Sequence, residues 1–389
     1  MRLLICAGGT GGGVYPALAV LQALVNRSQE GASSAAHGSE PLVNGLDVLW
    51  VGSYGGMEVD LVKRAKVPFR AISAAGVHGV GLRTLPGNLL RLARGYHQSR
   101  MILRQYRPEV LFFTGGYLAV PMALAGRRIP SVLYTPDIEP GMALKTLARL
   151  AGRIAVTADA SLKYYPRRPG VVVTGYPTRP ELNSWNPDDA RRALALQPGL
   201  PTLLVYGGSK GARSINRALQ AALPDLLSEM QVVHISGNLD WPEIEAARAG
   251  LGGRLAEPAW VDRYHAFPYL HTEMGAAFTV ADLVVARAGA SALGEFPLFG
   301  LPAILVPYPY AWRYQQVNAQ YLVQKGAACL LADEDLTHQL LPVVRDLMRD
   351  PDQREKMRTA MSSLAQPDAA ESIAHLLLDL ASHANQEGM

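Results

Sequence analysis

Charge, aromatic residues and cysteine are all scarce in this chain of 389 residues. Charged residues make up 18% of it, aromatic residues 7%, and the formal net charge is only +4. This basic excess suits anionic phosphates or an anionic membrane surface, but it is too small to indicate nucleic acid as a partner. Only two cysteines occur, Cys6 and Cys329, each inside an apolar run typical of a strand. We expect two buried, reduced thiols rather than a disulfide or a metal pair.

A clean apolar segment long enough to cross a membrane is also missing. The longest apolar run, residues 110–126, is interrupted by Thr114, two glycines and Pro121, whereas a spanning helix needs about 20 apolar residues. The short run at 2–7 ends at once in glycines and does not resemble a secretory signal. We therefore expect a cytoplasmic protein that touches a membrane only from outside.

Motifs for several kinds of chemistry are absent as well. The histidines show no HxxxH or HxH spacing, and no DxD follows a predicted strand, so we expect no metal site. The sequence has no GxxxxGK[ST] motif, which argues against a P-loop, and we expect no serine nucleophile. The N-terminal glycines lack the usual acidic residue about 20 positions later at the end of a second strand, so a nicotinamide site is poorly supported.

What the chain does have is an alternation of short aliphatic runs and stretches of helix length. Runs that are apolar on both faces are typical of buried parallel strands, and helices between them imply βαβ units. We predict strands within 2–7, 47–52, 110–115, 131–135, 153–157 and 170–175, and again within 202–208, 231–237, 283–289, 302–308 and 327–332. Helices are predicted within 16–26, 57–65, 86–105 and 141–151.

The strand pattern restarts after residues 175–189, which are rich in proline, asparagine and aspartate and have the composition of a linker. The restart predicts two doubly wound, Rossmann-like α/β domains, 1–178 and 179–389, with a cleft between them. Residues 27–45 are small, polar and unpatterned, so we expect a flexible surface insertion. The final helix is assigned to the second domain, with the alternative that it packs back on the first.

Each half begins with a glycine-rich loop that joins a strand to a helix. The loops read GGTGGG at 8–13 and GGSKGA at 207–212. Such a loop points backbone N–H groups at an anion, and the helix dipole favours the negative charge. Pro16 suits the first turn of the first helix. Either loop alone is equally compatible with a tight turn, but two matching loops favour a phosphate-bearing ligand.

Polar residues of the second half extend this prediction toward a nucleotide sugar. Glu295 falls near a helix start, where a carboxylate can accept hydrogen bonds from a ribose diol, and the loop at Gly289 and Ala290 can meet phosphate or sugar. Gln315 and Asn318 share one helix face and suit sugar hydroxyls. The alternatives are a solvated carboxylate favoured by the helix dipole and two amides on an exposed face.

Six motifs occur in the order and spacing of the MurG-type glycosyltransferases, which the chain resembles over about residues 1–380. They are GGTGG…PALAV near the N-terminus, GGY at 115–117, GYPTR at 175–179, GGSKGA at 207–212, RAGA…E at 287–295 and QQVNA at 315–319. These enzymes transfer N-acetylglucosamine from UDP-GlcNAc to the lipid-linked muramyl-pentapeptide of peptidoglycan synthesis. The resemblance implies a GT-B fold with no cofactor, in which the C-terminal domain binds the UDP-sugar and the N-terminal domain holds a polyprenyl-diphosphate-linked acceptor at the cytoplasmic membrane face.

The resemblance also implies roles for individual residues. On the donor side it assigns Gly208, Ser209 and Arg179 to the diphosphate, Glu295 to the ribose, Leu270 and His271 to the uracil, and Gln315 and Asn318 to the GlcNAc hydroxyls. Leu270 and His271 precede residues 273–285, which we expect to form a strand. In the first loop, Thr10, Gly11 and Gly12 are expected to face the acceptor's pyrophosphate.

Four departures from the family pattern fall mostly on the acceptor side. Gly13 stands where the family usually has histidine, and residues 134–137, YTPD, stand where it has His-Glu-Gln-Asn. Tyr176 replaces an asparagine, and Tyr314 lies in the family's DHQ-type turn. We expect an inverting, metal-independent transfer in which a general base deprotonates the acceptor hydroxyl. Asp137 is the first candidate base, although a turn residue is the alternative; Glu139 and His78 are the next candidates.

Three rival functions remain open. A transferase of the same fold can use another lipid or a small-molecule acceptor. A UDP-GlcNAc 2-epimerase shares the architecture, but it needs carboxylates and histidines around the sugar, and the sequence shows no such cluster. A paralogue can bind UDP-sugar without turnover. Finally, the basic, apolar-studded segment 82–107 predicts either attachment to anionic lipid or an ordinary amphipathic helix on the sheet.

Overall fold

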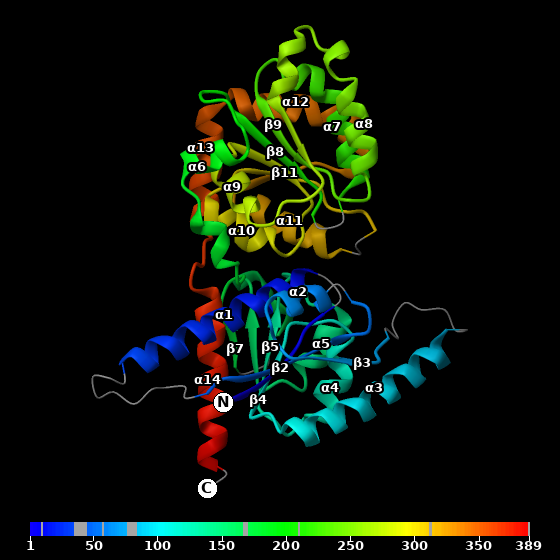
Figure 1. Cartoon of the computed structure of the whole chain (residues 1–389), viewed down its shortest axis with the longest axis vertical. Coiled ribbons are helices and arrows are strands. Elements are labelled where there is room, and N and C mark those ends of the chain that lie inside the picture. Colours follow the sequence, from blue (N-terminus) through cyan, green and yellow to red (C-terminus); the bar gives the residue numbers. More distant parts are fainter. Residues whose placement is uncertain are drawn as a thin grey trace. The chain divides into compact units, whose positions relative to one another are not determined.

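The computed structural model describes residues 1–8, 11–34, 45–56, 58–75, 84–165, 170–208, 211–310 and 313–387 (Figure 1). The chain divides into two compact units. The first is Met1–Arg179 together with Pro367–Met389, and the second is Pro180–Gln366. The division after residue 179 differs by one residue from the predicted boundary, and the last segment clusters with the first unit rather than the second.

The first unit is built on a parallel sheet of seven strands. They are β1 (Arg2–Cys6), β2 (Asp47–Ser53), β3 (Phe69–Ile72), β4 (Val110–Phe113), β5 (Ser131–Thr135), β6 (Arg153–Val156) and β7 (Val171–Val173). Their order across the sheet is β3-β2-β1-β4-β5-β6-β7. All described strand pairs are parallel, because a helix or a long connection separates each strand from the next.

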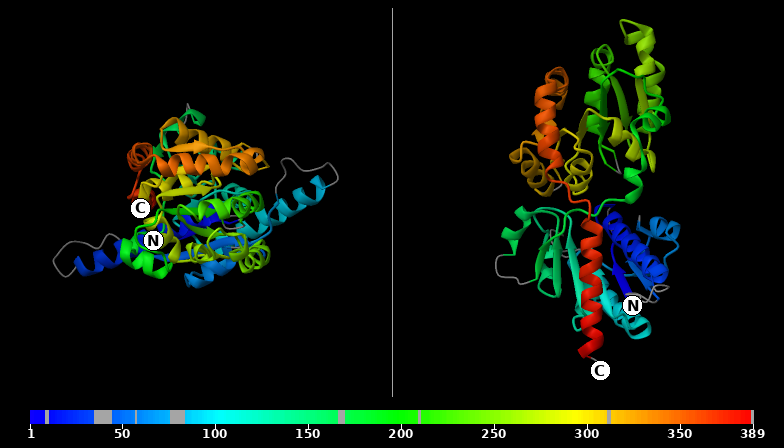
Figure 2. Two further views of the ribbon diagram at one scale, coloured as in Figure 1. Left: turned by 90° about the horizontal axis from the view of Figure 1, so that it is seen from above. Right: turned by 90° about the vertical axis from the view of Figure 1, so that its left-hand side faces the viewer.

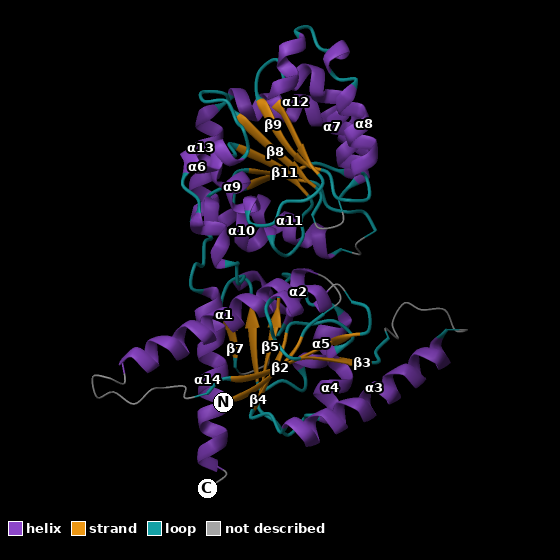
Figure 3. Ribbon diagram, viewed as in Figure 1, coloured by secondary structure: helices purple, strands orange, loops and turns teal. Residues whose placement is uncertain are grey.

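Helices cover both faces of this sheet (Figure 3). They are α1 (Gly11–Ser34), α2 (Glu58–Arg64), α3 (Leu85–Tyr106), α4 (Ala119–Ala125), α5 (Met142–Ala148) and α14 (Ala369–Glu387), with a 3-10 turn, η2 (Asp159–Tyr164). Helices α3, α4 and α5 pack on the face that carries Leu4, Cys6 and Leu111. Helix α14 lies beside α1 and against β4 and β5 (Figure 2), and Arg27 of α1 donates a hydrogen bond to Glu371 at 2.7 Å.

The second unit has a six-stranded parallel sheet in the order β10-β9-β8-β11-β12-β13. Its strands are β8 (Thr202–Tyr206), β9 (Gln231–Ile235), β10 (Tyr264–Phe267), β11 (Leu283–Ala286), β12 (Ala303–Leu305) and β13 (Ala328–Leu330). Its helices are α6 (Pro187–Ala193), α7 (Arg213–Leu226), α8 (Trp241–Ala249), α9 (Glu273–Val280), α10 (Ala292–Phe299), α11 (Tyr314–Gln324), α12 (Leu336–Arg349) and α13 (Pro351–Ser362). Short 3-10 turns are η3 (Pro180–Ser184), η4 (Gly252–Arg254), η5 (Pro258–Arg263) and η6 (Asp333–Asp335).

Two different cores hold this second sheet. Aliphatic side chains of α7 and α12 pack on one face, around Leu203 and Val205. On the other face, Tyr206 of β8 meets Phe278 of α9 and Phe296 of α10 in edge-to-face contacts with centroids 6.0 and 6.3 Å apart. Burial of both faces explains why the strands read as continuous apolar runs.

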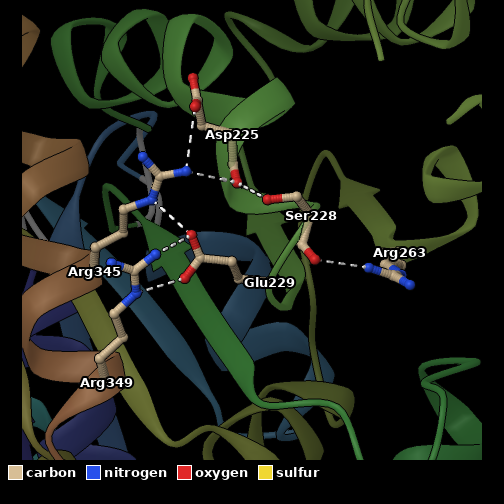
Figure 4. Close-up of polar contacts among 6 residues, drawn as sticks. All are labelled: Asp225, Ser228, Glu229, Arg263, Arg345 and Arg349. Atoms are coloured by element: carbon tan, nitrogen blue, oxygen red, sulfur yellow. Dashed lines mark hydrogen bonds and ion pairs between the residues drawn. The ribbon is translucent and has the colours of Figure 1, made fainter. Parts of the chain in front are cut away.

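Ion pairs tie α12 to the junction of α7 and β9 on the surface of the second unit (Figure 4). Glu229 accepts from Arg345 Nε at 2.8 Å and from Arg349 Nε at 3.0 Å. The hydrogen bond from Arg349, followed by the neighbouring arginine charges, lowers the pKa of Glu229. The arginines approach from one helix face, because they are spaced i, i+4 on α12.

Several predictions of local structure were wrong, each for a physical reason. Helix α1 begins at Gly11, so Pro16 lies inside the helix, and residues 27–34 continue the helix instead of opening an insertion. Residues 35–44 lie outside the described part. Residues 273–280 form α9 and only 283–286 a strand, since a uniformly apolar run does not separate a buried helix from a buried strand. The predicted linker contains η3 and the start of α6.

The cysteine prediction is confirmed for Cys6, which is buried in β1, whereas Cys329 in β13 is only half-buried. Both thiols are free. Burial raises the pKa of each thiol, and the Glu58 carboxylate contributes at Cys6. Neither thiol is therefore a ready nucleophile.

Candidate active site

Each sheet has one point at which the strand order reverses. In the first unit the reversal lies between β1 and β4, and in the second between β8 and β11. Ligands of doubly wound folds bind at the carboxyl ends of the strands at such a switch point. The loops that follow these four strands are therefore the candidate binding loops, and both predicted glycine loops are among them.

The glycine loop of the first unit starts beside a buried carboxylate. Glu58, the first residue of α2, is fully buried and accepts hydrogen bonds from the backbone N–H of Ser53 at 2.7 Å and from its hydroxyl at 2.6 Å. A Cβ added to Gly8 or to Gly56 would overlap this carboxylate. Glycine at both positions therefore lets the backbone pass close to this carboxylate without displacing it, which is a packing role the sequence did not reveal.

The loop after β4 forms the other wall of this switch point. Gly115 and Gly116 have φ of +110° and +82°, a region that glycine adopts at little cost. A Cβ on Gly13 would lie 3.2 Å from both the carbonyl oxygen and Oγ1 of Thr114. Thr114 is 3% exposed, and its Oγ1 is buried without a hydrogen-bond partner.

The glycine loop of the second unit is held by tight backbone packing. Gly208 and Gly211 have φ of +88° and +75°, and the Gly211 N–H donates to the Gly208 carbonyl at 2.9 Å. A Cβ on Gly211 would overlap the Ser236 carbonyl oxygen, whereas nothing lies within 4 Å of one on Gly208. The Gly208 side of the loop is thus open for a ligand to approach the backbone.

A chain of buried hydrogen bonds lies behind this loop. Asn216 of α7 donates from Nδ2 to the Ser236 carbonyl at 2.9 Å and to Asp240 at 3.0 Å. Its Oδ1 therefore faces His234 Nε2 at 3.0 Å, so Nε2 carries the proton and Nδ1 accepts from Tyr264 Oη at 2.7 Å. Burial lowers the pKa of His234 to about 3. The histidine is a neutral structural link between α7, β9 and β10.

Arg287, directly after β11, connects four loops at the same sheet edge. Its guanidinium donates to Asp333 at 2.5 Å and to the hydroxyl of Ser214 in the first turn of α7 at 2.7 Å. It also donates to the Val306 carbonyl at 3.2 Å and lies 5.3 Å from the ring of Tyr308. The Arg287 side chain is only 8% exposed, and that of Asp333 is 21% exposed. The guanidinium therefore serves mainly to hold these segments together.

Several predicted donor residues of the second unit lie in segments that directly follow its strands β10 and β11. Glu295 lies in the first turn of α10, half-buried, as expected for a carboxylate at a helix N-terminus. Gly289 and Ala290 precede that helix, and no atom lies within 4 Å of a Cβ added to Gly289. Leu270 is buried, whereas His271 is exposed with its ring 4.8 Å from that of Tyr269.

The two amides of α11 have different surroundings. Gln315 is half-buried, and its Oε1 accepts from the Tyr308 N–H at 2.8 Å. Asn318 is buried and donates to the Ala288 carbonyl at 3.2 Å. Asn318 therefore shapes the 287–290 loop, and Gln315 is the more accessible of the two amides. That both address the sugar remains a prediction.

The remaining predicted donor residue, Arg179, belongs to the first unit. Its guanidinium carbon lies 4.6 Å from the centre of the Tyr15 ring, and its Nε is buried without a hydrogen-bond partner. Gly11 is buried and Gly12 half-buried in the first turn of α1. Three predicted site residues, Thr10, His78 and Ser209, lie outside the described residues.

The two described candidate bases follow β5. Asp137 is half-buried in the loop after the strand. Glu139 is 1% exposed, lies 3.6 Å from the ammonium of Lys145 and accepts from Tyr164 Oη at 3.4 Å. Because Glu139 is enclosed and held in an ion pair, Asp137 is the better placed of the two to reach a substrate.

Two of the departures from the family pattern contact each other. Tyr134 and Tyr176 are buried, with ring centroids 6.4 Å apart in an edge-to-face arrangement. The hydroxyl of Tyr134 shares a hydrogen bond of 2.8 Å with Thr157. These two tyrosines form one packing unit inside the first unit.

The described residues contain neither a metal-binding cluster nor a membrane-spanning helix. No group of three or more histidine, cysteine, aspartate or glutamate side chains among them is arranged to hold a metal ion. None of their helices is long and apolar enough to cross a membrane. Metal independence remains a prediction.

Comparisons with known proteins fit this geometry. Residues 42–156 match the glycosyltransferase family 28 N-terminal domain, and residues 202–373 match the family 28 C-terminal domain. A UDP-N-acetylglucosamine–N-acetylmuramyl-(pentapeptide) pyrophosphoryl-undecaprenol N-acetylglucosamine transferase from Roseiflexus sp. (strain RS-1) is 39% identical, covering 97% of this chain and 94% of the relative. The transferase of the same name from Desulforudis audaxviator (strain MP104C) is 36% identical, covering 98% and 99%.

Solved structures support the fold. A crystal structure of MurG from Acinetobacter baumannii superposes with a TM-score of 0.70 at 23% identity, covering 97% of this chain and 99% of that one. A UDP-GlcNAc 2-epimerase from Neisseria meningitidis reaches 0.65 at 14% identity, covering 97% and 100%. The two domain matches and the two parallel sheets define a glycosyltransferase of GT-B fold. The chain belongs to the family of the UDP-N-acetylglucosamine–N-acetylmuramyl-(pentapeptide) pyrophosphoryl-undecaprenol N-acetylglucosamine transferases.

Proposed function

We propose that the chain transfers N-acetylglucosamine from UDP-GlcNAc to a lipid-linked muramyl-pentapeptide, the reaction in the names of its relatives. The observation that carries this proposal is the match over nearly the whole chain to those transferases. Sharing a fold with the 2-epimerases does not favour epimerisation, because fold alone does not specify chemistry.

On the donor side, the second unit offers a place for a diphosphate. Gly208 leaves its backbone open, and α7 begins just beyond the loop with its dipole favouring negative charge. In this mechanism, backbone donors and helix dipoles stabilise the departing UDP without a metal ion. Glu295 is assigned to the ribose diol and Gln315 to the sugar. Because Gln315 Oε1 accepts from Tyr308, its Nε2 is the group left to donate to a hydroxyl.

On the acceptor side, we assign the general base to Asp137. The base removes the proton of the acceptor hydroxyl as that oxygen attacks the anomeric carbon, and UDP leaves from the opposite side with inversion. The substitution Asp137→Asn keeps the size and shape of the side chain but removes the carboxylate that would accept the proton. We expect at least a hundredfold lower kcat with little change in the KM for UDP-GlcNAc. Near wild-type turnover would rule out this role.

The exposed face of α3 supports the proposed attachment to the cytoplasmic face of a membrane. Leu89, Leu90 and Met101 are 54%, 72% and 49% exposed. Gly95 and Gln98 dock the opposite side on β3, where the Gln98 Oε1 accepts from the Ser73 N–H at 2.7 Å. Arginines 91, 94, 100 and 104 lie on the same helix and are exposed, which suits anionic headgroups.

Flotation with phosphatidylglycerol vesicles tests this attachment, with phosphatidylcholine vesicles as the control. The wild type should float with the anionic vesicles at low salt, and Leu89→Ser with Leu90→Ser should float less. Absence of wild-type flotation would remove the membrane proposal and leave the transfer proposal standing.

The transfer itself is tested with UDP-GlcNAc and a lipid-linked muramyl-pentapeptide, following UDP release and product mass. Release of UDP that depends on this acceptor supports the proposal. Release only with another lipid or small acceptor would mean a transferase of different specificity. Tight UDP-GlcNAc binding without release would mean a binding protein.

A further inference from the structure

We propose that the hydroxyl of Thr114 binds the acceptor at the β1–β4 switch point, donating a hydrogen bond to an oxygen of the bound molecule. The inference rests on the proposed function, from which it takes that the first unit holds the acceptor. It adds a binding residue that neither the sequence motifs nor the donor-side geometry contains.

The first argument is the state of the hydroxyl. Thr114 Oγ1 is buried and has no hydrogen-bond partner, although almost all buried polar groups in folded proteins have one. Such a group carries a desolvation cost that the protein does not recover. A valine would fill the same space without that cost. A threonine is therefore best explained here by a partner that arrives with a ligand.

The second argument is position. Thr114 directly follows β4, and the loop from β1 passes beside it: a Cβ on Gly13 would lie 3.2 Å from Oγ1, and one on Gly116 would lie 3.5 Å from the Gly8 carbonyl oxygen. These are the two strands between which the sheet order reverses. The unpartnered hydroxyl thus lies where a doubly wound sheet places its ligand.

The third argument is that Thr114 and its loop can move when a ligand binds. Oγ1 is enclosed in this conformation, so bonding to a ligand requires rotation about the Thr114 χ1 angle or a shift of the neighbouring loop. Gly13 presents no side chain that would resist either change, and Gly115 and Gly116 follow Thr114 with φ of +110° and +82°. The two glycines that follow Thr114 give the segment more backbone freedom than any other residue would.

The test compares Thr114→Val, Thr114→Ser and the matched control Ser161→Ala. Ser161 Oγ is also buried without a partner, but it lies in η2 after β6, away from the switch point. For Thr114→Val we expect a threefold to tenfold rise in the KM for the muramyl lipid, corresponding to about one hydrogen bond. The KM for UDP-GlcNAc should not change, and the thermal midpoint should equal or exceed that of the wild type.

Thr114→Ser keeps a hydroxyl and should recover most of the acceptor affinity lost in Thr114→Val. Ser161→Ala should keep wild-type kinetics with an equal or higher thermal midpoint. Wild-type acceptor kinetics in Thr114→Val would overturn the inference, because the hydroxyl would then bond at most a fixed water. A lower thermal midpoint in Thr114→Val would also overturn it, by showing a partner within the folded protein.

Binding of the muramyl lipid, measured without UDP-GlcNAc, separates this inference from the proposed function. If the wild type binds the lipid but transfers nothing, and Thr114→Val binds it more weakly, the transfer proposal fails and the inference stands. If the wild type does not bind the lipid, both are overturned.

Discussion

The two switch points have the same parts but are supported in different ways. In both units a glycine loop joins the strand at the reversal to the next helix. In the second unit, hydrogen bonds run from Tyr264 through His234 and Asn216 to Asp240, behind the loop. In the first unit, the loop lies between the enclosed carboxylate of Glu58 and the unpartnered hydroxyl of Thr114.

This difference separates a site that is fixed in advance from one that is completed by its ligand. A loop backed by bonded polar groups keeps its N–H donors in place at no further cost, as stabilisation of a leaving diphosphate requires. A loop beside an unpartnered hydroxyl can gain one more hydrogen bond when a ligand binds. The four predictions below test this comparison, from the largest expected effect to the smallest.

The largest effect is expected from Gly211→Ala. The new Cβ would overlap the Ser236 carbonyl, and φ is +75°, so backbone strain and steric overlap add. We expect a loss of roughly 2–5 kcal/mol in the free energy of unfolding, measured by urea denaturation. Gly253→Ala is the control, because Gly253 is exposed and has no atom within 4 Å of an added Cβ. Equal stability of the two variants would mean that the second loop is not rigidly held.

Next is Glu58→Ala in the first unit. It removes the acceptor for the N–H and hydroxyl of Ser53, so we expect a loss of about 2–4 kcal/mol in the free energy of unfolding. Glu58→Gln keeps one acceptor oxygen and should lose less. Both are measured by thermal denaturation. If alanine and glutamine are equally destabilising, the hydrogen bonds to Ser53 are not what holds the loop.

Acid should weaken the second unit through His234. Burial holds its pKa at about 3 in the folded protein, against an ordinary value of 6.5. The unfolded chain therefore binds more protons between these values, and stability falls as pH drops from 6.5 toward 3. Between pH 7 and pH 5 the loss from this residue should be about 2 kcal/mol.

The check is a set of urea midpoints from pH 5 to pH 7 for the wild type and His234→Gln. The variant should be less stable at pH 7 but show a flatter dependence on pH. His265, whose pKa burial also lowers, titrates in both proteins, so the difference between the curves isolates His234. Parallel curves would contradict a neutral histidine in the network.

The smallest effect is expected at the ion pairs of Figure 4. Glu229 is 25% exposed and Arg349 66% exposed, so solvent screens their attraction. Glu229→Gln should cost less than about 1 kcal/mol, and the loss should fade in 1 M salt. Glu243→Gln, whose partner Arg217 is 64% exposed, is the control and should cost nothing measurable. A larger loss that does not depend on salt would mean that these surface pairs stabilise the unit as strongly as the buried hydrogen bonds around His234 do.

Much of the fold could be predicted because it depends on local patterns. Most strands appear in the sequence as unbroken aliphatic runs, and eleven strands were recognised from such runs. Two strands, β3 and β10, were missed. Both lie at the edges of their sheets and mix buried residues with partly buried or exposed ones, so neither forms an apolar run.

The candidate site could be predicted only where its residues form motifs. Glycine loops, Glu295 and Gln315 belong to such motifs. Arg287 was part of a recognised motif, but its ties to Ser214, Val306 and Asp333 could not be read from it. Glu58 offered one signal, a lone acid after a glycine-rich turn, and the neutral state of His234 offered none. Burial of Asn318 and enclosure of Glu139 likewise depend on elements distant in sequence.

The sequence by itself determined the family, most of the strands, and the presence of two glycine loops, because motifs and apolar runs are properties of neighbouring residues. Only the tertiary structure decided which residues support those loops. Parallel strands bring distant segments side by side, so Thr114 meets Gly13, Glu58 meets Gly8 and His234 meets Asn216. Whether a polar group is satisfied depends on such neighbours, and that is why the two loops, so alike in sequence, differ in what they leave for a ligand.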